Sequence, residues 1–205
     1  MFSPSRIYLA SQSPRRRELL KQIGINFDVL LLRNDPLRQI DVDEVALPDE
    51  PPLQYVERVC REKALAAWQA VSLRNLTACP VLTADTTVTV DGQIMGKPRD
   101  NPHAAEMLRN LSGRQHQVLT AIGVAFEDQY EFRVSTTTIL FAQLSEERIR
   151  RYLLSGEALD KAGAYGIQGQ ASAFVERLDG SYSGVVGLPL FETVELLNLF
   201  GVPTP

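Results

Sequence analysis

Asp85 and Lys97 lie in one stretch of this chain and supply a carboxylate and an ammonium group that could form a site together. Residues 81–90 are rich in Val, Thr and Leu and predict a strand. The Asp-Gly pair that follows predicts a tight turn, and residues 93–95 predict the returning strand. This hairpin brings both side chains to the same end. A strict ladder would point them to opposite faces, and a bulge at Gly96 could bring them together.

Two interpretations of this pair are open. Asp85 could be an edge-strand side chain and Lys97 a solvated surface lysine. The functional interpretation is favoured because strands disfavour aspartate, and because local sequence rules are most often broken at functional sites.

A second cluster lies between a predicted strand at residues 7–10 and a predicted helix that begins near Pro14. Ser11 and Ser13 precede three consecutive arginines, residues 15–17. A helix N-terminus carries partial positive charge, so three cations there repel it unless an anion lies among them. Free backbone amides, hydroxyl groups and arginines at a helix start are typical of a phosphate site, although a solvated basic turn is the alternative. On this interpretation, removal of an arginine would weaken phosphate binding and leave stability almost unchanged.

Lys63 falls within the apolar stripe of a long helix predicted from Pro51 to about Arg74. A lysine in that place either extends to the edge of the stripe or points into a polar cleft. The sequence leaves both alternatives open.

A glycine-rich segment runs from Asp160 to Gly169. Its three glycines predict a loop whose backbone can approach a ligand closely. The spacing matches neither the dinucleotide-binding pattern nor the P-loop, so the segment alone is a weak indication of a site.

Strands and helices in mixed order must position these residues. Further strands are predicted at 27–32, 117–126, 130–142 and 173–178, and further helices at 100–112, 145–155 and 189–200. Residues 33–50 are acidic, carry two prolines and predict a loop. His103 and His116 lack ligand spacing and are expected on the surface.

Composition limits the class of protein. The chain has 205 residues, of which 44% are hydrophobic and 22% charged, as in an ordinary soluble globule, and we expect one domain over residues 1–205. The net charge of −4 argues against nucleic acid as a partner, and no apolar run is long enough to span a membrane. With no signal peptide, and with Cys60 and Cys79 expected to be buried or idle thiols, a cytoplasmic location is expected.

Six motifs occur in a recognisable order along almost the whole chain. They are Ser11-Gln12-Ser13-Pro14-Arg15-Arg16, Arg61-Glu62-Lys63-Ala64, Ala84-Asp85-Thr86, Lys97-Pro98-Arg99-Asp100, the segment from Asp160 to Gly169, and Val186-Gly187-Leu188-Pro189. Together they resemble the signatures of the Maf family, nucleoside triphosphate pyrophosphatases first described as septum-formation inhibitors. Arg15 and the glycine-rich segment resemble most the branch that acts on dTTP and UTP.

The resemblance implies an α/β fold of the Maf/ITPase-like type, with a long mixed twisted sheet, flanking helices and two lobes around a nucleotide-binding cleft. It also implies a divalent cation, Mg²⁺, and a homodimer. One departure stands out. The family usually carries an acidic pair ending in glutamate shortly after the second strand, whereas Arg33-Asn34-Asp35-Pro36 stands there in this chain. Asp35 could take over part of that role.

The implied chemistry is the splitting of a triphosphate between its α and β phosphates, which requires neutralised charge and an oriented water. Asp85 is implied to orient or deprotonate that water. A free aspartate has a pKa of about 3.9 and is a weak base at neutral pH, so a metal-bound water would ease the step. Asp85 and Asp35 are the candidate metal ligands. The residues implied to hold phosphate oxygens are Ser11, Ser13, Arg16, Lys63 and Lys97.

The resemblance implies base selectivity for Gln168, whose amide both donates and accepts hydrogen bonds, as a pyrimidine with two carbonyls and one N–H requires. Without the resemblance, a surface side chain in a flexible loop is the favoured alternative. Arg15 and Thr86 would frame the nucleoside. Two alternatives remain open: a methylated guanine nucleotide, 7-methyl-GTP, as substrate, or a nucleotide-binding regulator of cell division with little turnover. The departure near Asp35 favours the second alternative.

Overall fold

The computed structural model describes residues 5–35 and 39–205, without the side chains of residues 34, 35, 39 and 40. The strands are β1 (Ile7–Leu9), β2 (Phe27–Val29), β3 (Asn34–Asp35), β4 (Gln39–Ile40), β5 (Val81–Val90), β6 (Gln93–Met95), β7 (Gln115–Phe126), β8 (Gln129–Phe141) and β9 (Val175–Asp179). The helices are α1 (Pro14–Gln22), α2 (Pro52–Leu73), α3 (Asn101–Leu111), α4 (Glu146–Leu154), α5 (Tyr182–Val186) and α6 (Leu190–Leu199), with 3₁₀ turns η1 (Ala162–Ala164) and η2 (Gln170–Phe174).

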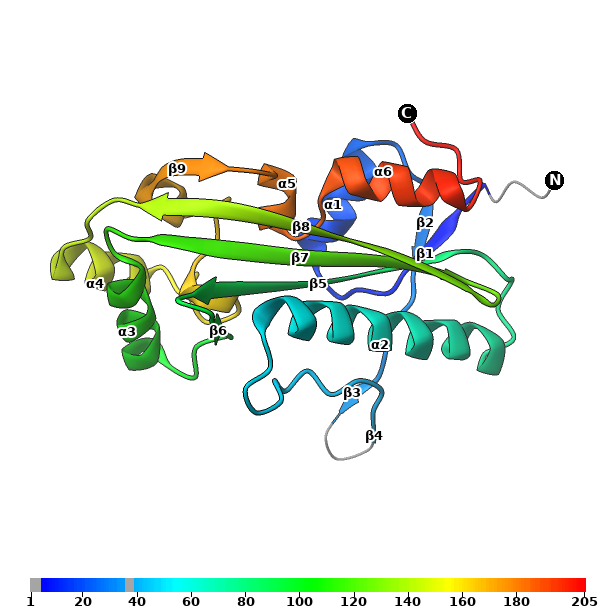
Figure 1. Ribbon diagram of the computed structural model, residues 1–205, viewed down its shortest axis with the longest axis horizontal. Helices are drawn as coiled ribbons and strands as arrows, with labels where there is room; N and C mark the ends of the chain where they lie inside the picture. The colour runs from blue at the N-terminus through cyan, green and yellow to red at the C-terminus, as the bar shows by residue number, and fades with distance from the viewer. Residues whose placement is uncertain (1–4, 36–38) are drawn as a thin grey trace.

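A seven-stranded mixed sheet forms the centre of the molecule (Figure 1). Its strand order is β2-β1-β5-β7-β8-β9, and β6 pairs with β5 outside this path. β1 pairs in parallel with β2 and β5, whereas the remaining pairs are antiparallel. The predicted α/β fold with a long mixed sheet and flanking helices is thus confirmed.

The two faces of the sheet are covered by different helices. β5 and β7 pack against α2, whereas α5 and α6 pack on β7 and β8 (Figure 1). Leu119 and Ala121 of β7 join the core cluster of α2, whereas Val118 and Ile122 belong to the larger core cluster with α6. Because successive strand side chains point to opposite faces, Asp85, which pairs with Ala121, lies on the α2 face.

The hairpin from β5 to β6 forms as the sequence predicts. Asp91 and Gly92 both have positive φ, and Val90 pairs with Gln93. The described ladder ends at the pair Val88 and Met95, so Lys97 lies beyond it.

Several predicted elements differ in the structure. The strand predicted over residues 27–32 ends at Val29, and the predicted loop at 33–50 contains the small β3–β4 sheet. The short helix α5 was not predicted. Cys60 and Cys79 are buried free thiols, as expected. In the described part of the chain, every helix is too short or too polar to cross a membrane.

His116 is the clearest error of the sequence prediction. It is 3% exposed instead of lying on the surface, because β7 carries it into the core. Its Nε2 lies 2.8 Å from the hydroxyl of Tyr165, and its ring contacts Phe141 edge to face. Burial lowers the pKa of His116 to about 4. The pair connects the sheet to the glycine-rich segment.

Candidate active site

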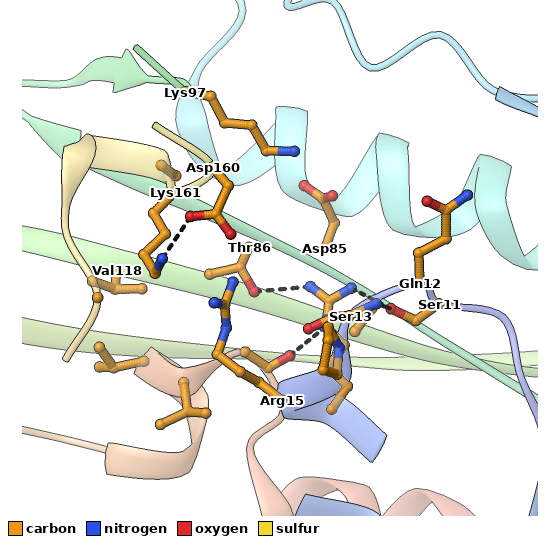
Figure 2. Close-up of a pocket in the computed structure, with 18 of the residues that line it drawn as sticks. Ser11, Gln12, Ser13, Arg15, Asp85, Thr86, Lys97, Val118, Asp160 and Lys161 are labelled. Atoms are coloured by element: carbon orange, nitrogen blue, oxygen red, sulfur yellow. Dashed lines mark hydrogen bonds and ion pairs between the residues drawn. The ribbon is translucent and has the colours of Figure 1, made fainter. Parts of the chain in front are cut away.

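A cleft of about 720 Å³ collects the residues that the sequence singled out. Figure 2 shows its floor, where side chains from the loop after β1, the start of α1, β5 and the glycine-rich segment converge. Among the lining residues are nine predicted site residues: Ser11, Ser13, Arg15, Arg16, Lys63, Asp85, Thr86, Lys97 and Gln168. Their roles remain predictions, but the fold brings them to one place.

A gap along one edge of β5 explains the position of this cleft. The other edge of the strand pairs with β7 almost throughout. On the open edge, β1 pairs only with Val81 and Leu82, and β6 pairs only with residues 88–90. Among the described strands, residues 83–87 therefore lack a partner on that edge. Asp85 and Thr86 lie in this gap, where a ligand can reach the strand.

Lys63 joins two carboxylates on the α2 side of the gap. Its Nζ lies 2.8 Å from Asp85 Oδ1 and 2.8 Å from Glu44 Oε1. The side chains of Lys63 and Asp85 are only 13% and 10% exposed, whereas Glu44 is 52% exposed. Of the two alternatives for Lys63, the structure therefore selects the polar cleft. It also corrects the hairpin hypothesis, because the salt bridge of Asp85 is with Lys63, and Lys97 only extends toward it (Figure 2).

Arg16 occupies the opposite side of the gap and contacts neutral oxygens. Its Nε donates to the carbonyl of Gly187 at 2.7 Å, and its terminal nitrogens donate to Ser11 Oγ and Thr86 Oγ1, each at 3.2 Å. Burial lowers the pKa of Arg16, and the charge of Asp85 opposes that shift. The guanidinium thus joins three separate segments, so we now expect its removal to destabilise the fold, contrary to the expectation from the sequence.

Ser13 lies at the N-cap position of α1, but its side chain makes no capping hydrogen bond. Its backbone N–H instead donates to Ser11 Oγ at 3.2 Å. The helix start therefore has the expected basic character without an internal acidic residue in its first turn. This arrangement suits an external anion.

Glu44 is the site residue that the sequence analysis missed. The Asp43-Glu44 pair is acidic and ends in glutamate, like the pair that the family usually carries, but it follows a longer segment after β2. The pair was missed because it lies farther from β2 than expected. Its two consecutive acidic residues were the signal that could have identified it. Because Glu44 contacts Lys63 beside Asp85, the residues at Arg33-Asn34-Asp35-Pro36 no longer argue for a protein with little turnover. The side chain of Asp35 lies outside the described residues, so its role as a metal ligand stays a prediction.

The glycine-rich segment forms another wall of the cleft and packs against the end of β5. Gly163 has φ of 68°, its N–H donates to the carbonyl of Gly96, and an added Cβ would meet Val88 at 3.0 Å. Glycine is therefore required where the segment packs on the hairpin. Gln168 is exposed at the cleft. In Figure 2, the Arg15 side chain extends from the start of α1 toward the glycine-rich segment.

The chemistry of the cleft combines several cations with two adjacent carboxylates. The cations suit a polyphosphate, and Asp85 and Glu44 offer the oxygen ligands that Mg²⁺ prefers. In the described part of the chain, no group of three or more His, Cys, Asp or Glu side chains could hold a metal. Two carboxylates nevertheless fit Mg²⁺, which usually takes one or two from the protein and completes its shell with water and substrate phosphates.

Comparison with known proteins gives relatives that align with almost the whole chain. Proteins named dTTP/UTP pyrophosphatase from Nitrosomonas europaea, Dechloromonas aromatica and Aromatoleum aromaticum are 56%, 50% and 50% identical to this chain. The alignments cover 96%, 96% and 97% of this chain and 95%, 98% and 97% of the relatives.

Among solved structures, the Ham1 protein of Staphylococcus aureus matches with a TM-score of 0.50 and 16% identity, over 95% of this chain and 97% of that one. That likeness shows the fold alone. Residues 6–200 match the family model described as Maf-like protein. The chain therefore belongs to the family of Maf-like proteins.

Proposed function

We propose that this protein hydrolyses dTTP and UTP to the nucleoside monophosphate and pyrophosphate. The observation that carries the proposal is the Asp85 carboxylate, held by Lys63 beside Glu44 in a cleft lined with cations. Relatives that share half or more of their residues with this chain bear the name of this activity. The site geometry and the names of the relatives both support a nucleoside triphosphate as substrate.

Phosphate binding would use the basic side chains on both walls. Arg16 and Lys97 would contact phosphate oxygens, and the Ser11 and Ser13 hydroxyl groups would complete the cradle at the start of α1. Lys63 would hold Asp85 in place and share its remaining donors with the substrate. Charge neutralisation and positioning supply most of the rate in phosphoryl transfer, so these contacts suit the reaction.

Asp85 would orient the attacking water and accept its proton. Its carboxylate lies in the strand gap, and the salt bridge to Lys63 prevents it from turning away. Asp85 and Glu44 would hold Mg²⁺ together. When bound, this ion would neutralise phosphate charge and make its water more acidic. The protein therefore has to supply two ordered carboxylates and exclude competing water.

Base selection would depend on Gln168 in the glycine-rich segment. Its amide can pair with both the carbonyl and the N–H of uracil or thymine. Arg15 and Thr86 would frame the nucleoside between this segment and the phosphate cradle. Thr86 is already ordered by Arg16 and by Thr120, whose Oγ1 is 3.0 Å away.

Pyrophosphate release with Mg²⁺ over dTTP, UTP, CTP, GTP and 7-methyl-GTP tests the proposal. We expect dTTP and UTP to have the highest kcat/KM. A preference for 7-methyl-GTP would favour the other branch of the family, and nucleotide binding without release would favour a regulatory protein. Sedimentation of the same sample would test the predicted homodimer.

A further inference from the structure

The segment that carries Glu44 is fastened to α2 by a set of contacts that we call the Arg58 strap, made by Tyr55, Arg58 and Glu50. The strap contacts the backbone carbonyls of two consecutive residues, Glu44 and Val45. None of its three side chains lines the cleft. The strap can therefore affect the cleft only through the segment that it holds.

Arg58 forms the centre of the strap. Its Nε and one terminal nitrogen donate to the two carboxylate oxygens of Glu50 at 2.6 and 2.9 Å. The same terminal nitrogen donates to the carbonyl of Val45 at 3.1 Å. Hydrogen bonds from Arg58 hold the pKa of Glu50 at about 2, and the Glu50 side chain is only 7% exposed. A bidentate pair of this kind fixes direction as well as distance.

Tyr55 supplies the second attachment, next to the reactive side chain. Its hydroxyl donates to the carbonyl of Glu44 at 3.0 Å. Its ring packs against the small core cluster shared by α2 and β7, and the Arg58 guanidinium lies 5.8 Å from the ring centre. Tyr55 therefore links the backbone at Glu44 to the core between α2 and β7.

One helix thus holds both the backbone and the side chain of Glu44. Tyr55 and Arg58 hold the backbone at Glu44, and Lys63, farther along α2, holds its side chain. Without the strap, the backbone at Glu44, whose side chain is 52% exposed, would lose its hydrogen bonds to α2 and keep only the side-chain contact with Lys63 to that helix. Ligands on loops are held less accurately than ligands on regular elements, and a metal ligand must be placed to within about 0.5 Å.

We propose that Arg58, Glu50 and Tyr55 are positioning residues that set Glu44 for a divalent cation shared with Asp85. The inference rests on the proposed function for the identity of the cation site. It gives three residues outside the cleft a role in the binding of the metal that the reaction uses. Loss of residues that orient a ligand typically weakens metal binding or activity by roughly 10- to 100-fold.

Tyr55→Phe and Arg58→Gln test the strap, with Arg109→Gln as the matched control. Arg109 makes the same bidentate contact with Glu146, at 2.8 and 2.8 Å, on the exposed surface away from the cleft. Mn²⁺ binding, followed by electron paramagnetic resonance with a non-hydrolysable dTTP analogue, should weaken roughly 10- to 100-fold in Arg58→Gln. It should weaken about 5-fold in Tyr55→Phe, where one hydrogen bond is lost, and stay unchanged in the control.

A double-mutant cycle with Glu44→Gln separates positioning from general loss of structure. If the strap acts through Glu44, Tyr55→Phe should cause no further loss of Mn²⁺ affinity in the Glu44→Gln background. Equal loss in both backgrounds, or unchanged affinity in the folded single variants, would overturn the inference.

The outcomes also separate this inference from the proposed function. Wild-type protein that binds Mn²⁺ through Glu44 but releases no pyrophosphate would contradict the activity and leave the strap supported. Wild-type protein that releases pyrophosphate while Glu44→Gln keeps its Mn²⁺ affinity would overturn the strap alone. Thermal melts of Tyr55→Phe, which keeps the packed ring, would verify that the variant is folded.

Discussion

Lys63 and Arg16 are cations of the same cleft, but their partners differ in charge. Lys63 contacts two carboxylates, Asp85 and Glu44, at 2.8 Å each. Arg16 contacts one carbonyl and two hydroxyl groups, all neutral. The charge of Lys63 is therefore neutralised inside the protein, whereas the charge of Arg16 remains available to an anion.

This difference separates two tasks that residue type alone would merge. A lysine between two carboxylates orders the acidic groups that handle water and metal. An arginine held by neutral acceptors is oriented in advance without losing its attraction for phosphate. The side of the cleft next to α2 is thus suited to chemistry, and the side next to α1 to binding.

Removal of the Asp85 charge should have the largest effect, on the side of the cleft next to α2 that is suited to chemistry. Asp85→Asn keeps the size of the side chain but removes the base and a ligand, so kcat for dTTP should fall roughly 10²- to 10⁴-fold. Binding of a non-hydrolysable dTTP analogue should survive, because the α1 side is intact. Steady-state kinetics and calorimetry measure the two effects, and near-normal kcat would make Asp85 a structural residue.

Arg16→Ala should impair the binding side of the cleft, next to α1, and should affect KM and stability. Loss of a charged hydrogen bond costs about 1.5–3 kcal/mol, so KM for dTTP should rise roughly 10- to 150-fold. The loss of three internal hydrogen bonds should also lower the free energy of unfolding by about 2–3 kcal/mol. Arg17→Ala is the control, since Arg17 lies on the same helical turn but does not line the cleft. An unaltered melting curve for Arg16→Ala would show that its internal contacts contribute little.

Gln168→Ala should leave both sides intact and change base selection. An unpaired base edge costs about 1–3 kcal/mol, so kcat/KM for dTTP and UTP should fall roughly 5- to 150-fold. Poor substrates such as GTP should change much less. The comparison requires kcat/KM for dTTP, UTP, CTP and GTP in both proteins. An equal loss for all four would assign Gln168 to phosphate positioning or loop structure.

A pH effect on stability should arise outside both sides of the cleft. The pKa of His116 is about 4 in the folded protein and about 6.5 when unfolded, so only the unfolded chain binds the proton between these values. The contribution of His116 is fully present above pH 6.5 and declines as the pH falls toward 4. Between pH 7.5 and 5.5 the free energy of unfolding should drop by about 1 kcal/mol.

Denaturant melts of the wild type and His116→Gln at these two pH values measure the effect. His103→Asn is the control, because the chain has only these two histidines and His103 is only partly buried. The difference between the two pH values should shrink in His116→Gln and persist in His103→Asn. Equal pH dependence in all three proteins would assign the effect to other groups.

The sequence by itself determined most of the local elements and nine of the residues that line the cleft. Turn residues located the hairpin at Asp91 and Gly92, and Asp100 and Ser145 cap α3 and α4 with their side chains. These features depend on neighbours in the chain, so propensity and capping rules describe them. The motif order also indicated the family, which the comparisons confirm.

Only the tertiary structure decided which of these residues meet. The partner of Asp85 is Lys63 and not Lys97, because the β5–β6 ladder ends before Lys97 while α2 packs along β5. The burial of His116 and the arrival of Glu44 at the site likewise depend on contacts between distant segments. The periodicity of a sequence shows which side chains share a face of a helix or strand. It does not show which other element packs on that face, because this depends on contacts between segments that are distant in the chain.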